Sequence, residues 1–386
     1  MRVLIVKVSS LGDVIHTLPA VTDAHRARPD IVFDWVVEEN FSEVPSWHPA
    51  VDRVIPVALR RWRKNALRSF RGPEFKQFRE EIKREHYDLV IDAQGLIKSG
   101  LISRLARGLT VGLSDSTIRE PLATLFYNKV YSVPWSEHAV DRVRQLFSRA
   151  LQYEYNPRVV DYGIDAEALL KQDAQAAAGQ SVNKKQLVFL HGTTWQSKHW
   201  PTAYWCSLAR LARQAGYEVL LPWGDADERE RAQLIAQEAD ATVLDKQSLS
   251  GLAGYLATAA GVIAVDTGLG HLAAALARPT LSLYGPTNPG LSGTYGHTQK
   301  HLQVDFECAP CMKKTCRFKG EPVVAAEGEV HPPCFSSQPP ESVWREFEAL
   351  LAESAEGHRV AAYGDPESRF ARPAANPFAV ELSEER

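Results

Sequence analysis

Short apolar segments alternate with helical stretches along most of the chain, and this alternation limits the fold more than any other feature of the sequence. In the first half, the apolar segments are residues 2–8, 31–37, 51–57 and 89–92. After residues 9–12, which are turn-forming, Val14, Leu18 and Val21 have helical spacing and predict one helix. Strands that alternate with helices form parallel sheets through βαβ units. The first half is therefore predicted to be Rossmann-like.

A second series of the same kind follows. Strands are predicted at 186–190, 218–222, 261–265 and 280–284, with helices at 202–215, 227–239, 249–259 and 270–277. The predicted fold class is α/β, with two Rossmann-like domains facing across a central cleft. Ligands of such sheets bind at the carboxyl ends of the strands, so this cleft is the expected site.

The domain boundaries follow from changes in composition. We predict an N-terminal domain at 1–165, a connection rich in Ala, Gln and Asp at 152–183, and a C-terminal domain at 183–340. Residues 341–356 predict a C-terminal helix. Residues 357–386 lack periodicity and predict a mobile tail.

The charge balance limits the partners. The 386 residues include 44 basic and 47 acidic ones, a formal charge of −3. This argues against a nucleic-acid partner, because such binding needs a positive excess. No apolar run is long enough for a transmembrane helix, and the N-terminus does not have the pattern of a signal peptide. A cytoplasmic protein is expected.

The turn after the first strand carries a carboxylate. Gly12 is its only glycine, which excludes a dinucleotide fingerprint of the G-x-G-x-x-G type. Asp13 follows at the expected start of a helix, where the helix dipole favours its ionised form. It could accept a proton from a substrate hydroxyl, or it could simply cap the helix.

Two loops of the second half suit an anionic ligand. Residues 266–271 are glycine-rich and follow an apolar strand, so their N–H groups are expected to face a phosphate or diphosphate. Thr193, Thr194 and Lys198 follow the strand at 186–190 and supply two hydroxyls and a cation. The alternatives are a tight turn capped by Asp266 and a solvated lysine.

The sharpest basic cluster surrounds Trp62. Arg60, Arg61, Arg63 and Lys64 could hold a multiply anionic substrate or an anionic membrane surface, or could form a solvated face. Further candidates in the first half are Arg119, His138 and Arg142.

Four cysteines lie late in the chain at positions 308, 311, 316 and 334. The spacing of Cys308, Cys311, Cys316 and Cys334 permits a structural zinc site, but it is irregular, and reduced thiols that bind no metal are favoured. No cofactor is expected. An Asp-x-Asp motif in a cleft-facing context is absent from the sequence, so we expect Lys198 and loop N–H groups, not a divalent cation, to stabilise a leaving diphosphate.

Taken together, these motifs resemble the lipopolysaccharide heptosyltransferases of inverting glycosyltransferase family 9. The resemblance runs from Met1 to about Gly296 and rests on KVSSLGDVIHTLPA, FDWVVEE, RRWRK, DAQGLIKS, REPLATLFYN, LPWGDADERERA, VDTGLGHLAAAL and LYGPTNPGL. RRWRK and REPLA favour the heptosyltransferase I group. There are three alternatives. The chain could be a related enzyme that adds a later heptose, a nicotinamide-dependent oxidoreductase, or a lipopolysaccharide-binding module without catalysis.

The resemblance implies a GT-B fold, ADP-L-glycero-D-manno-heptose as donor and the inner Kdo of Kdo2-lipid A as acceptor, at the cytoplasmic face of the inner membrane. It also implies the roles of single residues. The implied catalytic base is Asp13. Donor-binding positions are Thr193, Thr194, Lys198, Glu228, Asp266, Thr267, Gly268 and His271. Acceptor-binding positions are Ser10, Arg60, Arg61, Arg63, Lys64, Arg119, His138 and Arg142. Gln247 departs from the apolar residue that relatives often have near the adenine.

Overall fold

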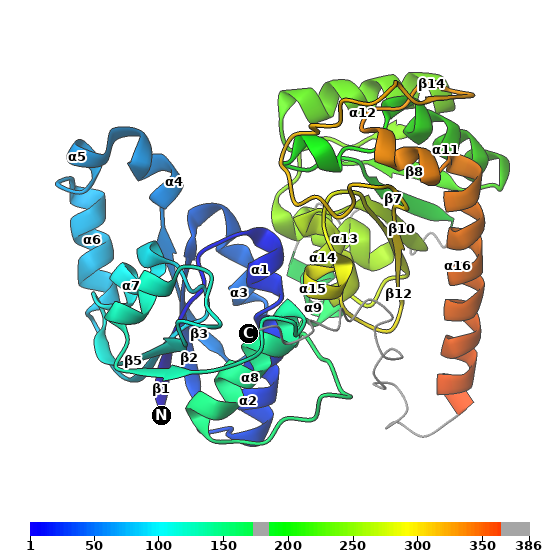
Figure 1. The fold of residues 1–386 in the computed structure, drawn as a ribbon. Coiled ribbons are helices and arrows are strands. Elements are labelled where there is room, and N and C mark those ends of the chain that lie inside the picture. Colours follow the sequence, from blue (N-terminus) through cyan, green and yellow to red (C-terminus); the bar gives the residue numbers. More distant parts are fainter. Residues whose placement is uncertain (173–184, 364–386) are drawn as a thin grey trace, which may run out of the picture. The chain divides into compact units, whose positions relative to one another are not determined.

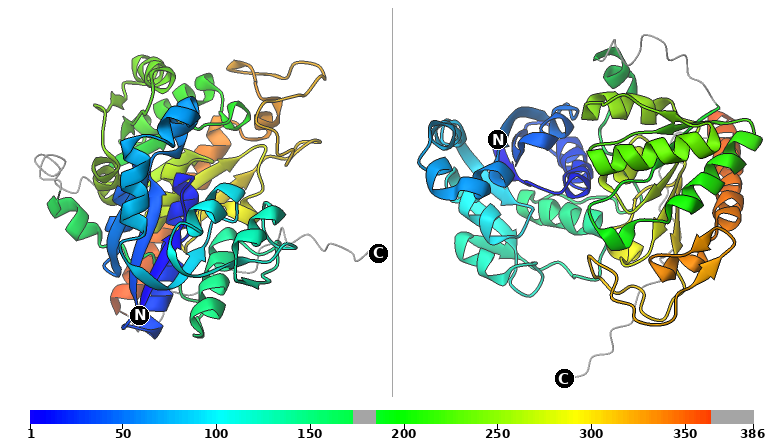
Figure 2. Two further views of the ribbon diagram at one scale, coloured as in Figure 1. Left: turned by 90° about the vertical axis from the view of Figure 1, so that its left-hand side faces the viewer. Right: turned by 90° about the horizontal axis from the view of Figure 1, so that it is seen from above.

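The computed structural model describes residues 1–172 and 185–363. The chain divides into two compact units, unit 1 at Met1–Asp165 and unit 2 from Ala166 onward. Each unit holds one six-stranded parallel sheet with helices on both faces (Figures 1 and 2). The two Rossmann-like halves predicted from the alternation are therefore confirmed.

In unit 1 the first strand of the chain lies inside the sheet. The strand order is β3-β2-β1-β4-β5-β6. The bounds are β1 (Arg2–Val6), β2 (Val32–Glu38), β3 (Val51–Val57), β4 (His86–Asp92), β5 (Arg107–Leu113) and β6 (Lys129–Tyr131). This is the strand order of dinucleotide-binding Rossmann folds, in which the sheet reverses its direction of growth between β1 and β4.

The helices of unit 1 connect these strands. They are α1 (Leu11–Ile15), α2 (Leu18–Ala27), α3 (Glu43–Ser46), α4 (Leu59–Trp62), α5 (Ala66–Ser69), α6 (Pro73–Ile82), α7 (Ile97–Ser103) and α8 (Ala139–Leu151), with 3-10 helices η1 (Glu39–Phe41), η2 (Arg63–Asn65) and η3 (Pro121–Phe126).

Unit 2 repeats the topology. Its strand order is β12-β11-β10-β7-β8-β9, so the reversal falls between β7 and β10. The strands are β7 (Gln186–Leu190), β8 (Glu218–Leu221), β9 (Thr242–Val243), β10 (Gly261–Val265), β11 (Thr280–Tyr284) and β12 (Gln299–Gln303), with a separate hairpin of β13 (Val324–Ala325) and β14 (Gly328–Glu329).

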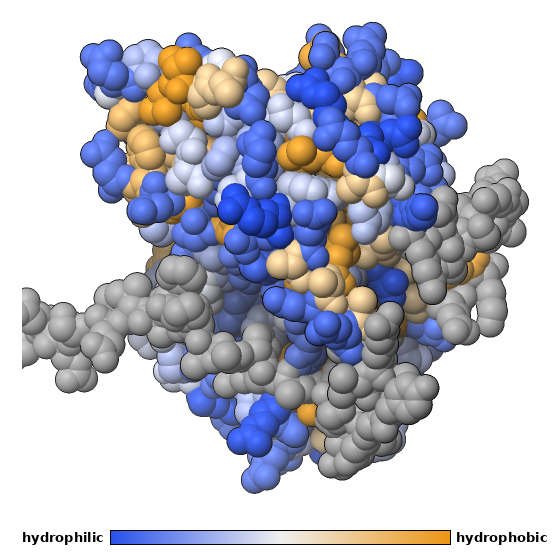
Figure 3. All heavy atoms as spheres, turned by 90° about the vertical axis from the view of Figure 1, so that its right-hand side faces the viewer, coloured by the Kyte–Doolittle hydropathy of each residue, from blue (hydrophilic) through white to orange (hydrophobic). Residues whose placement is uncertain are grey.

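The helices of unit 2 include one long C-terminal element. They are α9 (Ala166–Gln172), α11 (Thr202–Gln214), α12 (Ala226–Ala239), α13 (Leu249–Thr258), α14 (Gly268–Ala275), α15 (Pro289–Ser292) and α16 (Pro340–Tyr363), with η4 (Gln196–Lys198) and η5 (Pro333–Ser337). Mostly hydrophilic residues form the surface on the side of α16 (Figure 3). Within the two described ranges, no helix is both long and apolar enough to cross a membrane.

The central strands are buried on both faces, as their continuous apolar runs predict. Val3 to Val6 of β1 and the whole of β10 have almost no exposed surface. Helices on both faces of a parallel sheet remove both sides of its central strands from water.

The structure differs from the sequence prediction at several elements. The single helix expected after Asp13 is two, because Pro19 in the first turn of α2 has no N–H to continue the hydrogen bonds of α1. Of the strands in the two six-stranded sheets, β5, β6, β9 and β12 were not predicted, since their segments are short or their apolar patterns are weak. Helix α16 continues beyond residue 356 to Tyr363. Residues 173–184 of the predicted connection and 364–386 of the predicted tail lie outside the described residues.

A buried arginine ties the outer helices of unit 1 together. Arg144 in α8 has no exposed surface, and its Nε lies 2.6 Å from Asp23 Oδ2 in α2. Its Nη2 also donates to the carbonyls of Asn156 and Val159. A buried arginine with these partners fixes α8 and the chain after it against α2.

We expect Arg144→Met to lower the free energy of unfolding of unit 1 by about 3–5 kcal/mol, because the mostly buried Asp23 would lose the arginine that donates to both of its carboxylate oxygens. Urea unfolding followed by hydrogen exchange of the β1 and β2 amides measures this change. Arg158→Met, at an exposed position, is the control. Equal unfolding midpoints for the two variants would contradict the prediction.

Candidate functional site

The candidate residues lie at the reversal points of the two sheets. In unit 1, Asp13 lies in α1, directly after the loop that follows β1, and β1 pairs with β4 along the reversal. In unit 2, Lys198 follows β7 and Asp266 follows β10, the two strands that meet at the reversal. Loops on the two sides of such a point leave a crevice at the carboxyl ends of the strands, which is where ligands of these sheets bind.

The Asp13 carboxylate bonds locally, and its side chain is partly exposed. Its Oδ2 accepts hydrogen bonds from the Ser10 N–H and the Ser10 hydroxyl, both at 2.8 Å. Its Oδ1 lies 3.9 Å from Lys7 Nζ, and 41% of the side chain is exposed. The sequence left two interpretations of Asp13 open, a helix cap and a proton acceptor. This geometry is compatible with both.

Lys7 is a buried cation beside this carboxylate. Its Nζ donates to the Ala93 carbonyl at 2.8 Å. Burial lowers the pKa of Lys7, the charge of Asp13 opposes this effect, and Arg142 adds to it. Lys7 thus carries a charge whose main ionic partner is the carboxylate at the start of α1.

Three other predicted residues of unit 1 lie near this group. The Arg142 guanidinium stacks on the Trp135 ring at 4.0 Å, and its pKa is lowered by burial and raised by Asp13. His138 begins α8, and its ring contacts His16 at the end of α1, with 5.6 Å between ring centroids. Arg119 is exposed and close enough to lower the pKa of Lys7.

The basic cluster around Trp62 divides into two kinds of residue. Arg61 forms ion pairs with Glu39 at 3.0 Å and Glu74 at 2.8 Å, so its charge is already neutralised within unit 1. Arg60, Arg63 and Lys64 are exposed, and no ion pair within the described residues is recorded for them. The structure therefore separates Arg61 from the other predicted acceptor residues as a structural link between α4, η1 and α6.

In unit 2, the two predicted anion-binding loops meet. Lys198 Nζ lies 2.6 Å from Asp266 Oδ2, and both side chains are mostly buried. Thr193 donates to the Asp266 carbonyl at 2.9 Å, and Thr287 donates to Asp266 Oδ2 at 2.6 Å. The ammonium is thus held in place by a carboxylate, with the hydroxyl of Thr193 beside it.

The start of α14 completes this group. Thr267 precedes the helix and Gly268 is its first residue, so N–H groups without helical partners lie directly after Asp266. His271 is buried in the same helix and lowers the pKa of the neighbouring His301, which burial brings to about 4. Thr194 is exposed in the loop after β7. This end of unit 2 combines a cation, hydroxyls and a helix N-terminus, which suits a diphosphate.

Glu228 lies beside the same loops. Its Oε2 accepts the Gly224 N–H at 2.7 Å. Gly192 approaches so closely that a Cβ there would lie 2.2 Å from Glu228 Oε1, so a larger residue would displace the Glu228 side chain. Gln247, the departure noted near the expected adenine position, donates to the Asp245 carbonyl at 3.1 Å.

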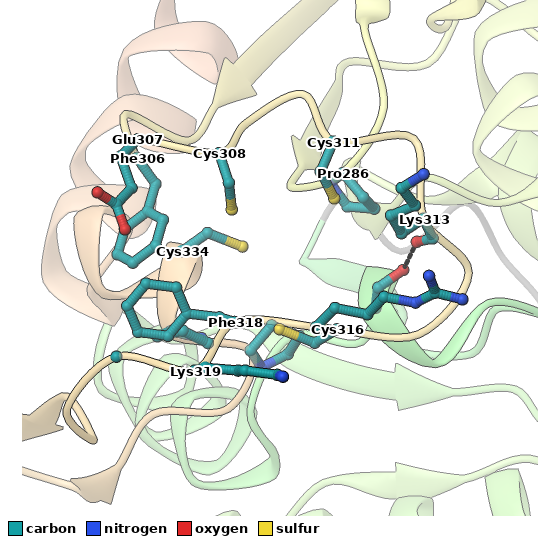
Figure 4. A pocket seen from close by; sticks show the side chains of 15 residues that line it. Pro286, Phe306, Glu307, Cys308, Cys311, Lys313, Cys316, Phe318, Lys319 and Cys334 are labelled. Atoms are coloured by element: carbon teal, nitrogen blue, oxygen red, sulfur yellow. Dashed lines mark hydrogen bonds between the residues drawn. The ribbon is translucent and has the colours of Figure 1, made fainter.

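The four late cysteines line one pocket of about 510 Å³ in unit 2 (Figure 4). All four are free thiols. Burial raises the pKa of Cys334 to about 12, and the other three thiols add to the effect. Among the described residues, no group of three or more His, Cys, Asp or Glu side chains is placed to hold a metal ion. We therefore propose no zinc at this pocket.

Lys7 and Thr287 were missed by the sequence analysis. Lys7 lies inside the apolar segment at 2–8, where a lysine is itself an unusual signal. Thr287 is one of many threonines, and no spacing links it to Asp266. Only the fold brings the loops after β10 and β11 together.

Comparison with known proteins identifies close relatives. The model of a family described as glycosyltransferase family 9 (heptosyltransferase) matches residues 75–321. Lipopolysaccharide heptosyltransferase 1 of Pseudomonas aeruginosa is 54% identical over 357 residues, which cover 91% of this chain and 98% of that protein. The protein of the same name from Escherichia coli K12 is 51% identical over 301 residues, 78% of this chain and 92% of that protein.

Solved structures agree in fold. The structure of E. coli heptosyltransferase WaaC with ADP has a TM-score of 0.77 at 44% identity and covers 91% of this chain and 100% of that one. The structure of the same E. coli protein with ADP-2-deoxy-2-fluoro heptose has a TM-score of 0.75 at 43% identity and covers 90% and 99%. The two six-stranded parallel sheets match these structures, which confirms the predicted GT-B fold class.

The contact between Lys198 and Asp266 can be tested by a double-mutant cycle with Lys198→Met and Asp266→Asn. We expect a coupling free energy of about 1–3 kcal/mol, because each single change leaves a mostly buried polar group without its partner. Hydrogen exchange of the β7 and β10 amides in urea measures it. Strictly additive effects would show that the two side chains do not interact.

Proposed function

The chain belongs to glycosyltransferase family 9, the heptosyltransferases, and we propose that it transfers L-glycero-D-manno-heptose from ADP-L-glycero-D-manno-heptose to the inner Kdo of Kdo2-lipid A. This would be a step of lipopolysaccharide core synthesis at the cytoplasmic face of the inner membrane. The observation that carries the proposal is the pair of sites at the sheet reversals, a half-exposed carboxylate in unit 1 and a buried ammonium beside a helix N-terminus in unit 2.

Unit 2 would bind the donor. The two phosphates of ADP would be bound by Lys198, Thr193, Thr194 and the N–H groups at the start of α14. Asp266 holds Lys198 in place, while Thr287 holds Asp266. Glu228 would bind the ribose hydroxyls, a role supported by the position of its carboxylate beside Gly192 and Gly224, in the loops after β7 and β8. His271 is a further donor-side residue, by its place in α14.

Unit 1 would bind the acceptor and start the reaction. The Asp13 carboxylate takes the proton of a Kdo hydroxyl, and the hydroxyl oxygen attacks the anomeric carbon of the heptose. The bond from that carbon to the ADP oxygen breaks, and the electron pair leaves with ADP. One carboxylate suffices for a single displacement, so the configuration inverts.

The cations of both units support this step. Lys7 and Arg142 lie near Asp13, and their positive charge favours its anionic form. Lys198 and the α14 N–H groups stabilise the negative charge that develops on the leaving diphosphate. The anionic groups of the acceptor would be bound by Arg60, Arg63, Lys64, Arg119 and His138. Arg61 would hold α4, which carries Arg60, in position through its ion pairs. Ser10 would hold Asp13 in position.

The displacement requires both sets of residues to contact one pair of substrates. Domain closure around the bound substrates, a motion common in two-domain enzymes, would meet this requirement.

The function is tested by incubating the protein with ADP-heptose and either Kdo2-lipid A or its heptosylated product, and by measuring ADP release. We expect release with Kdo2-lipid A. Release with the heptosylated acceptor alone would assign the chain to the later heptose transfer. No release with either acceptor would contradict the proposal.

We expect Asp13→Asn to lower kcat by about 10²-fold or more while the affinity for ADP-heptose stays within about twofold. The amide oxygen can still accept the Ser10 N–H, so α1 keeps its start, but it cannot take a proton. Asp115→Asn, an exposed carboxylate of the same unit, is the matched control. Unchanged turnover in Asp13→Asn would leave only a binding role for unit 1.

Lys7 should produce a fall in kcat at alkaline pH. Its folded-state pKa lies below the ordinary lysine value because of burial. Its charge is therefore present at low pH and is lost as the pH rises through this lowered pKa. We expect Lys7→Met to remove this fall and to lower kcat by about tenfold or more near neutral pH. The control Lys76→Met, at an exposed position, should keep the wild-type profile. An identical profile in Lys7→Met would exclude Lys7 from the reaction.

A further inference from the structure

Unit 1 has an apolar surface that its own packing does not explain. Ile97 and Leu101 of α7 are 36% and 53% exposed, and Leu122 and Leu125 of η3 are 63% and 78% exposed. The first two are four residues apart in an α-helix and the second two are three apart in a 3-10 helix, so each pair shares one face of its helix. Single exposed leucines are ordinary, but a group of them marks a binding surface.

Helices α7 and η3 pack against each other, so the four side chains belong to one region. The Phe126 ring lies so close to Gly100 that a Cβ there would be 2.6 Å from it. The Ile97 N–H donates to Glu120 Oε2 at 2.8 Å, directly before η3. We call the surface made by Ile97, Leu101, Leu122 and Leu125 the α7–η3 face.

The charges near the α7–η3 face are mainly positive. Residues 97–130 contain five Lys or Arg residues and two acidic ones, in a chain whose formal charge is −3. Arg104, Arg119 and Lys129 are exposed. One of the two acidic residues, Glu120, is already bonded to the start of α7. Exposed leucines in the same segment as exposed cations suit the boundary between the headgroups and acyl chains of an anionic bilayer.

The α7–η3 face adjoins the residues around Asp13. Lys98 of α7 donates from Nζ to the Ser9 hydroxyl at 3.3 Å, in the loop that leads to Asp13. Burial lowers the pKa of Lys98, and Arg60 and Arg63 add to this effect, so the basic cluster is also near. Leu67 and Phe70, which follow this basic cluster in the sequence, are also exposed.

We propose that the α7–η3 face docks unit 1 on the surface of an anionic lipid bilayer, with its leucines among the lipids and its cations at the headgroups. The proposal rests on the proposed function in one respect, since it names the surface by which the same enzyme meets a lipid-anchored acceptor. A symmetric dimer through this face is disfavoured, because it would bring identical cations together.

The test is flotation of the full chain with phosphatidylcholine vesicles, with and without phosphatidylglycerol. Neither substrate is present, so the result does not depend on the reaction. We expect binding to the anionic vesicles, weakened by salt, and at least about tenfold weaker binding of the double variant Leu122→Ser/Leu125→Ser. Leu234→Ser, which changes an exposed leucine of unit 2, is the matched control and should bind as the wild type does.

A second variant guards against misfolding of the first. Arg104→Glu/Lys129→Glu changes only exposed charges and should also weaken binding to anionic vesicles by at least about tenfold. Binding that is unchanged in both variants, or equal on neutral and anionic vesicles, would overturn the proposal. If the protein instead forms dimers without lipid, and Leu122→Ser/Leu125→Ser abolishes them, the α7–η3 face binds a second copy of the chain and the proposal is overturned.

Discussion

The reversal of strand order beside the first strand of each sheet is the constraint on which the rest of the structure depends. In unit 1 the reversal lies between β1 and β4, and in unit 2 between β7 and β10. Crossover helices go to opposite faces on the two sides of a reversal, so the loops there separate and leave room for a ligand. The connections that lead to Asp13, Lys198 and Asp266 all begin at these strands. The same topology, used twice, therefore gives this family 9 glycosyltransferase one candidate site in each unit.

Each candidate site pairs a lysine with a carboxylate, but the more exposed partner is the carboxylate in unit 1 and the lysine in unit 2. Unit 1 offers a partly exposed carboxylate, Asp13, with Lys7 and Arg142 nearby. Unit 2 offers an ammonium, Lys198, whose position is fixed by Asp266 and, through it, by Thr287. A proton acceptor belongs with a nucleophilic hydroxyl, and a fixed cation with a departing diphosphate. The proposed division of labour follows from these charges.

Much of this could be predicted from the sequence, because the signals are local. The central strands are continuous apolar runs, and the bounds of β3, β7, β10 and β11 agree with those predicted. The loops around Asp13, Lys198 and Asp266 were found because turn residues, polar side chains and strand ends coincide in the sequence.

The environments of Arg61 and Lys7 could not be predicted from the sequence, because they depend on residues that are distant along the chain. Arg61 belongs to an evident basic cluster, yet Glu39 and Glu74 neutralise it. Lys7 acquires its role only because the fold buries it beside Asp13.

The anomeric configuration of the transferred heptose tests the central claim most directly. Nuclear magnetic resonance of the product made from ADP-heptose and Kdo2-lipid A measures it. A single displacement with Asp13 as the base predicts the configuration opposite to that of the donor. A product that retains the configuration of the donor would contradict the account.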